Sequence, residues 1–177
     1  MKATANLSQA LKQDYEPNVK QYDYNPAQAK ALLAEAGYRP GPDGILVTAS
    51  GERFSIVCDI FQGDSLRRNQ AEMARRNFST VGIEMRLREM DSAAFARAGL
   101  TGTYDMALLN WTYRGISGDP DGRAALMCEG MNNRSKWCNT EAERLLQEGA
   151  KAVEPAKRRE IYNDLQKLVA EEVRFSS

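Results

Sequence analysis

The stretch YDMALLNWTYRGISGDPDG, Tyr104 to Gly122, decides the fold expected of this sequence. It opens with the unbroken apolar run 106–109, which is typical of a short strand buried on both faces. Polar and aromatic side chains follow at once: Asn110, Trp111, Tyr113 and Arg114. Ligands usually bind outside the carboxyl ends of the strands of an open α/β sheet, so this ending is a candidate binding edge. The aromatic residues fit equally well as a seal on the end of a core.

Alternating strand and helix patterns precede this strand. The expected elements are a helix from Pro26 to Gly37, a short strand 45–48, a strand 54–60, a helix from Asp64 to about Thr80, a strand 83–87, a short helix 91–98 and the strand 104–111. The third to fifth of these predict a right-handed parallel βαβ unit. Its helix is expected to turn Leu66, Met73, Ala74 and Phe78 inward. The fold class is therefore α/β, with at least three strands.

Two helices are expected after the Asp-Pro turn. Thr140 and Glu143 have the spacing of a capping box, in which their side chains accept hydrogen bonds from free backbone N–H groups. The apolar faces of the two helices are formed by Ala142, Leu145, Leu146 and Gly149, and by Ile161, Leu165, Leu168 and Val169. The first 21 residues lack periodicity and are expected to form an extended arm.

The composition narrows the possible functions. The 177 residues suffice for one domain with a real core, and 24 basic residues balance 24 acidic ones. This balance argues against a general nucleic-acid binder, which needs a basic footprint. The sequence contains no histidine, the commonest general base and a frequent metal ligand. An enzyme is less favoured for that reason, although carboxylates, lysine or tyrosine could still catalyse a reaction.

The three cysteines leave two alternatives open. None forms a C-x-x-C pair, so a structural zinc site is not expected. Cys128 and Cys138 flank a loop rich in Asn, Gly and Ser and could form a disulfide, whereas Cys58 has the pattern of a small core residue. Three free thiols are about as compatible with the sequence as one disulfide and one buried thiol.

Asp119 and Asp121 form the tightest acidic cluster. They could contribute to a Mg²⁺ or Ca²⁺ site, but both ions need more oxygen ligands than this segment offers. The favoured interpretation is a helix start, with Asp119 as N-cap and Pro120 at the first helical position.

Several motifs, taken in order, resemble one known family. They are YNPAQAKALLAEAGY at Tyr24–Tyr38, GPDGI at Gly41–Ile45, the segment around Trp111 with Asp119–Asp121, and RREIYNDLQKLVAEE at Arg158–Glu172. Together they are similar to the family 5 extracytoplasmic solute-binding proteins, of the peptide, dipeptide and oligopeptide type, that serve bacterial ABC importers. The resemblance runs from about Tyr22 to Val173.

The resemblance implies one lobe of a periplasmic-binding-protein clamshell, with a mixed sheet of βαβ units flanked by helices. It implies that residues 22–177 are the C-terminal lobe of a truncated chain, from which the N-terminal lobe and the signal peptide are absent. The implied ligand is a peptide or similar small organic solute, delivered to the transmembrane subunits of a permease outside the cytoplasm. No catalytic residue, metal, cofactor or nucleic acid is implied, and the lobe alone is expected to bind solute weakly.

The resemblance also implies that Asn110, Trp111, Thr112, Tyr113 and Arg114 line the cleft between the lobes. Peptide-binding relatives carry an aspartate there that pairs with the α-amino group of the ligand, and no carboxylate stands at this place here. Arg114 would instead favour a carboxylate or another anionic group. It could equally well point to solvent or pair with a nearby aspartate.

Two other functions remain as alternatives. One is a carboxylate-dependent hydrolase that uses Asp119, Asp121 and a tyrosine. The other is a sensory or interaction module derived from a solute-binding lobe.

Overall fold

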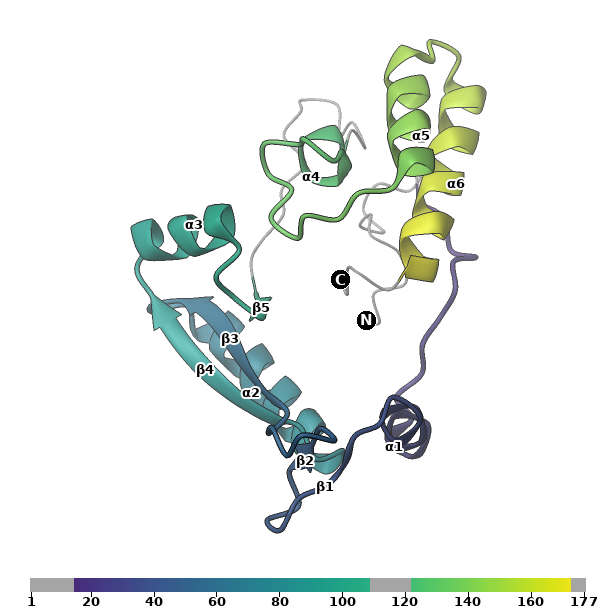
Figure 1. The fold of residues 1–177 in the computed structure, drawn as a ribbon. Helices are drawn as coiled ribbons and strands as arrows, with labels where there is room; N and C mark the ends of the chain where they lie inside the picture. Colours follow the sequence, from purple (N-terminus) through teal and green to yellow (C-terminus); the bar gives the residue numbers. More distant parts are fainter. Residues whose placement is uncertain (1–14, 109–121, 173–177) are drawn as a thin grey trace. The chain divides into compact units, whose positions relative to one another are not determined.

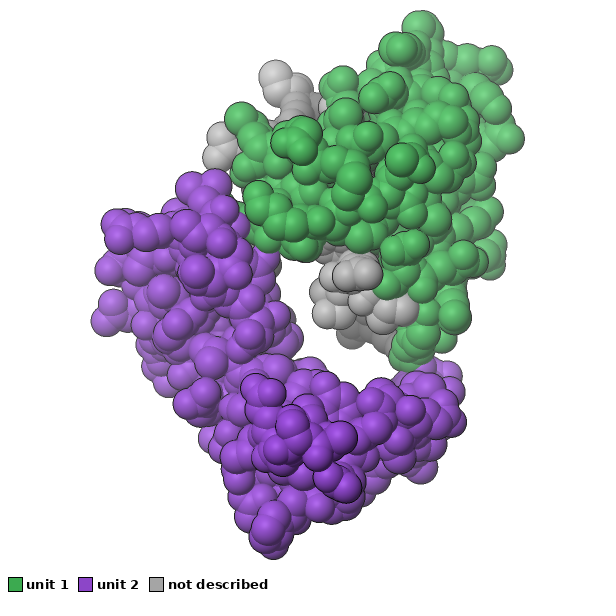
Figure 2. All heavy atoms as spheres, viewed as in Figure 1, with its two compact units in different colours: residues 1–22, 111–177 green, residues 23–110 purple. Residues whose placement is uncertain are grey.

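The computed structural model describes residues 15–108 and 122–172, which fall into two compact units. Unit 2 is the continuous segment Asp23–Asn110, and unit 1 combines Met1–Tyr22 with Trp111–Ser177 (Figure 2). The expected division into an arm of residues 1–21 and a lobe of residues 22–177 stays a prediction. None of the described helices has the length and apolar character needed to cross a bilayer.

A three-stranded parallel sheet forms the centre of unit 2. Its strands are β3 (Ser55–Phe61), β4 (Glu84–Met90) and β5 (Met106–Ala107), in the order β4-β3-β5. Helix α2 (Ser65–Thr80) connects β3 to β4, so the expected parallel βαβ unit is confirmed. Helix α3 (Ser92–Thr101) connects β4 to β5 (Figure 1).

Helix α2 begins where the sequence predicts, because the side chain of Asp64 accepts a hydrogen bond from the backbone N–H of Arg67 at 2.9 Å. Its inward face is partly different from the prediction. Ala74 and Phe78 pack on the sheet with Ala71, as expected. Leu66 and Met73, however, are exposed, because each precedes a residue of the face that turns inward and so lies about 100° away from it.

A second, small core in unit 2 adjoins the first, because Ile56 and Phe78 pack against both. Helix α1 (Pro26–Glu35), with Asn25 as its N-cap, is followed by the antiparallel pair β1 (Arg39–Pro40) and β2 (Leu46–Val47). Buried apolar residues close this core: Leu46, Val81 and Ile83. The antiparallel pairing belongs to this two-stranded sheet, whereas the three-stranded sheet is parallel throughout its described length.

Unit 1 is helical in its described part. Helices α5 (Thr140–Lys151) and α6 (Pro155–Glu172) lie side by side, and α4 (Arg123–Leu126) contacts α5 (Figure 1). The predicted inner face of α5 is confirmed at all four positions: Ala142, Leu145, Leu146 and Gly149 are buried. On α6, Ile161, Leu165 and Val169 are buried, and Leu168 is partly buried against the same core.

The start of α5 differs from the prediction. Asn139, not Thr140, is the N-cap, and its side-chain oxygen accepts hydrogen bonds from the backbone N–H groups of Glu141 and Ala142 at 2.9 and 3.0 Å. Asn is a better N-cap than Thr, and it stands one residue earlier. The predicted capping box is therefore wrong, and Glu143 accepts a hydrogen bond from the backbone N–H of Cys128 at 3.0 Å instead.

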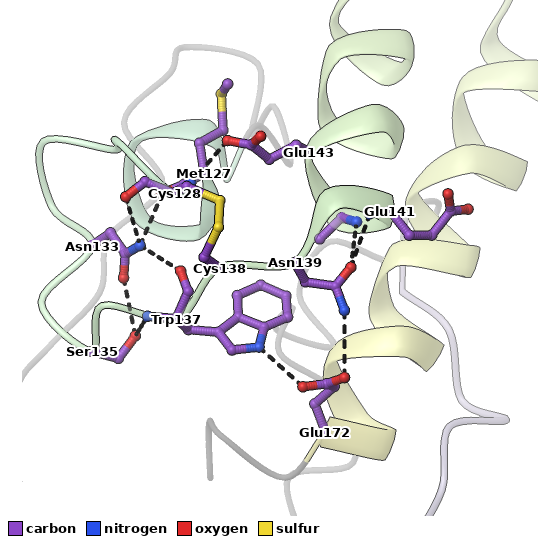
Figure 3. The surroundings of a disulfide bond; sticks show 11 residues. Met127, Cys128, Asn133, Ser135, Trp137, Cys138, Asn139, Glu141, Glu143 and Glu172 are labelled. Carbon is purple, nitrogen blue, oxygen red and sulfur yellow. Dashed lines mark hydrogen bonds between the residues drawn. A yellow bond between two sulfur atoms is a disulfide. The ribbon is translucent and has the colours of Figure 1, made fainter.

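Cys128 and Cys138 form a disulfide, and Cys58 is a buried free thiol, so the second of the two open alternatives holds (Figure 3). Inside the closed loop, the side-chain amide of buried Asn133 donates to backbone carbonyls, of which that of Trp137 is nearest at 2.7 Å. The indole N–H of Trp137 donates to Glu172 at 3.1 Å. The bonds of Asn133 hold the loop together, and that of Trp137 attaches it to the end of α6.

Residues 15–22 contain neither helix nor strand and lie against α6. The backbone N–H of Glu16 donates to the side-chain oxygen of Gln166 at 3.2 Å, and Val19 is buried. The described part of the expected arm is thus held on unit 1.

Candidate functional site

The chain reverses its direction across the sheet between its second and third strands. It moves from β3 to the neighbouring β4 on one side, and then crosses back to place β5 on the other side of β3. The connections on the two sides of β3 therefore run in opposite directions. In open α/β sheets, such a switch point leaves a crevice outside the carboxyl ends of the strands, where ligands bind.

The two connecting helices contact opposite faces of the sheet, and α3 does so near the carboxyl end of β3. Helix α2 packs on Cys58 and Ile60, whereas Phe95 of α3 stacks on Phe61 with ring centroids 4.1 Å apart. Successive side chains of a strand point to opposite faces, so Phe61 lies on the face opposite Ile60. The sheet is consequently an open α/β sheet of the doubly wound type.

Backbone hydrogen bonds fix the carboxyl ends of the three strands. The N–H of Gln62, just after β3, donates to the carbonyl of Met90 at the end of β4, at 2.8 Å. The N–H of Leu108, just after β5, donates to the carbonyl of Asp59 at 3.0 Å. All three strands thus end at one edge, which is the candidate functional site.

An ion pair lies two residues before the ends of β3 and β4. Asp59 and Arg88 are opposite each other in the pairing of β3 with β4. The guanidinium of Arg88 donates to both oxygens of Asp59, from Nε at 2.7 Å and from Nη2 at 2.8 Å. The hydrogen bond to Asp59 raises the pKa of Arg88 above its ordinary value. Sequence reasoning missed this pair, because the strand register that joins its members is not visible in the sequence.

The predicted ligand-binding residues lie outside the described residues: Asn110, Trp111, Thr112, Tyr113 and Arg114. Described structure extends to Leu108 and resumes at Gly122, which is the N-cap of α4. Asp119 and Asp121 fall in the same gap, so the expected helix start there stays a prediction.

The described residues hold no arrangement suited to a metal or a thiol nucleophile. Within residues 15–108 and 122–172, no three side chains of His, Cys, Asp or Glu lie close enough together to hold a metal ion. Burial raises the pKa of the Cys58 thiol to about 11. This thiol remains protonated at neutral pH and is therefore a poor nucleophile.

Comparison with known proteins identifies the family. The profile of the bacterial extracellular solute-binding proteins, family 5, middle region, matches residues 2–133, which is most of the chain. The chain therefore belongs to this family, and the resemblance carried by its motifs is confirmed.

Curated relatives are similar along nearly the whole chain. A protein of Pseudomonas aeruginosa, named di/tripeptide-binding protein 3, is 27% identical over 163 residues, which cover 90% of this chain and 29% of that protein. The dipeptide-binding protein of Escherichia coli is 29% identical over 163 residues, which cover 86% of this chain and 28% of that protein. The chain thus spans less than a third of the length of these relatives.

A solved structure shows the same fold. The oligopeptide-binding protein from Thermus thermophilus, in complex with a pentapeptide, superposes with a TM-score of 0.83 and 24% identity. The superposition covers 97% of this chain and 32% of that one. The expected α/β fold of a periplasmic-binding-protein lobe is therefore confirmed.

Proposed function

We propose that the chain is part of the solute-binding component of an ABC importer, and that it binds a peptide or similar small organic solute without catalysing a reaction. Membership of family 5 carries this proposal. The names of the relatives support a peptide ligand, because both are called binding proteins for short peptides.

The proposal includes a location and partners. The family is described as extracellular, which supports a place outside the cytoplasm. The transmembrane subunits of the permease would receive the solute. The relatives are more than three times longer than their aligned regions, which supports a second lobe of the same protein as the other wall of the cleft.

The proposed ligand site is the segment from Asn110 to Arg114. Its support is the carboxyl edge of the sheet, where β5 lies beside the switch point. Leu108 is the last described residue before the segment, and two residues of chain reach about 7 Å at most. Asn110, where the proposed site begins, is therefore within reach of a ligand at this edge.

Calorimetry with the protein that contains both lobes tests the site. Trialanine and trialanine C-terminal amide serve as probes, because they differ only in the carboxylate that Arg114 is proposed to bind. We expect the free acid to bind at least about tenfold more tightly, and Arg114→Gln to abolish that preference. The control is Arg76→Gln, at an exposed position of α2. Equal preference in the wild type and in Arg114→Gln would exclude the role of Arg114.

A second experiment tests the ligand class. Native mass spectrometry of the same protein, purified without unfolding, should detect a retained peptide that is lost after unfolding and refolding. Retention of a different organic molecule would exclude a peptide and leave the other small organic solutes of the proposal. Retention of nothing, together with no binding of di-, tri- or tetra-alanine, would contradict the proposal.

A further inference from the structure

Within the described residues, which end at Leu108 here, strand β5 shares few backbone hydrogen bonds with the sheet. Its pairing with β3 comprises two residue pairs, Cys58 with Met106 and Asp59 with Ala107, followed by the bond from Leu108 to Asp59. Strands this short depend on their surroundings for a fixed position. The position of the candidate edge must therefore come largely from other contacts.

A side chain extends the pairing at the start of β5. The backbone N–H of Val57 donates to Oδ2 of Asp105 at 2.8 Å. The carboxylate thus occupies the place at which a longer β5 would offer a backbone carbonyl. A hydrogen bond to a charged acceptor is stronger than a neutral backbone bond.

Arg88 joins three segments at once. Besides its two bonds to Asp59, its Nη2 donates to the backbone carbonyl of Thr103, in the turn from α3 to β5, at 3.1 Å. The pKa of Arg88 is raised further by the charge of Asp105. One guanidinium on β4 therefore holds β3 and the turn that leads into β5.

Burial makes this arrangement hard to replace. The side chain of Asp59 is 1% exposed, whereas that of Arg88 is 46% exposed. A buried carboxylate cannot exchange its partner for water without a large cost, so Arg88 is held in one geometry even though its outer side is solvated. The planar guanidinium suits this task, since lysine cannot bond both oxygens and a carbonyl from one plane.

We propose that Arg88, held by Asp59, is a positioning residue for ligand binding: with Asp105 it fixes the carboxyl end of β5 at the switch point, and so sets the affinity of the site. This inference rests on the proposed function for its ligand. The fixing of β5 can be measured without any ligand.

The test compares Arg88→Met and Arg88→Lys with Arg86→Met as the matched control. Arg86 is exposed on the same strand and the same face, two residues from Arg88, and no hydrogen bond to Asp59 or Thr103 is found for it within the described residues. Amide hydrogen exchange is followed by mass spectrometry in the two-lobed protein. Protection of α2, which lies in the same unit as Arg88, shows that this unit is folded in each variant.

We expect amides of residues 103–108 to exchange about tenfold faster in Arg88→Met, less so in Arg88→Lys, and unchanged in Arg86→Met. Trialanine affinity, from calorimetry, should fall in the same order, by about tenfold in Arg88→Met. Unchanged exchange in Arg88→Met would refute the fixing of β5. Faster exchange with unchanged affinity would refute the link to the ligand. If the wild type binds no peptide, the proposed function and the ligand link both fail, while exchange still decides the fixing of β5.

Discussion

Removing the disulfide of unit 1 should cost it a measurable part of its stability. The change is Cys128→Ala together with Cys138→Ala. The bond closes a loop with a sequence separation of 10. In the chain-entropy treatment of the unfolded state, a loop of that length is worth about 2.7 kcal/mol at 25 °C. For a unit of this size, the loss corresponds to a fall of about 10 to 20 °C in midpoint temperature.

Contacts inside the loop sharpen this expectation. Asn133 still donates to the carbonyls of Met127 and Trp137 without the disulfide, and Trp137 still bonds Glu172. The folded loop can therefore keep its shape, and the lost free energy arises in the unfolded chain. We expect the double variant to fold, with a fluorescence spectrum of the folded state like that of the wild type.

The assay is urea unfolding followed by tryptophan fluorescence. The sequence has two tryptophans, so Trp111→Phe leaves Trp137, which is buried in unit 1, as the reporter. Dithiothreitol should lower the midpoint of the parent protein to that of the double variant, and should leave the double variant unchanged. Without reductant, equal stability of the parent and the double variant would refute the reasoning. An equal effect of dithiothreitol on both proteins would refute it too.

Two further substitutions test the packing and the start of α5. Gly149→Ala would place a Cβ 2.9 Å from the ring of Tyr162. Thermal unfolding should therefore show a loss of about 1–3 kcal/mol in the free energy of unfolding, and a gain would contradict the tight helix contact. Asn139→Ala removes the cap of α5 and should lower the free energy of unfolding by about 1 kcal/mol, whereas Thr140→Ala should change it by no more than about 0.5 kcal/mol. The reverse order in urea unfolding would support the capping box of Thr140 and Glu143 instead.

Helix boundaries were predictable because their causes are local. Asn25 and Asp64 cap their helices through bonds to backbone groups three residues away, so a short window of sequence contains the whole interaction. The same local rule misplaced the start of α5 by one residue, since Asn139 and Thr140 are both good caps. The spacing from Thr140 to Glu143 favoured the second candidate, although asparagine is the better cap.

The inward face of α2 was not predictable from apolar residues alone. Its few large apolar side chains do not form one stripe, and charged residues occupy most of the helix. The face with Ala71 packs on the sheet because a small residue lets the helix approach closely. Arg67 is buried on the same face. An arginine can be buried there because its stem is apolar. The pattern of residues therefore predicted the helix but left its rotation open.

Asp59 shows how a sequence pattern can mislead about burial. Its alternation with Cys58 and Ile60 is typical of a strand with one solvated face, yet the side chain is buried. The carboxylate is covered locally by the guanidinium of Arg88 and by the turn from α3 to β5 that Arg88 contacts, although Arg88 itself is exposed. A buried charged residue requires a partner of opposite charge, and Arg88 on the neighbouring strand β4 meets that requirement. The alternation alone could not show this pairing, because the register that places Arg88 opposite Asp59 is not visible in the sequence.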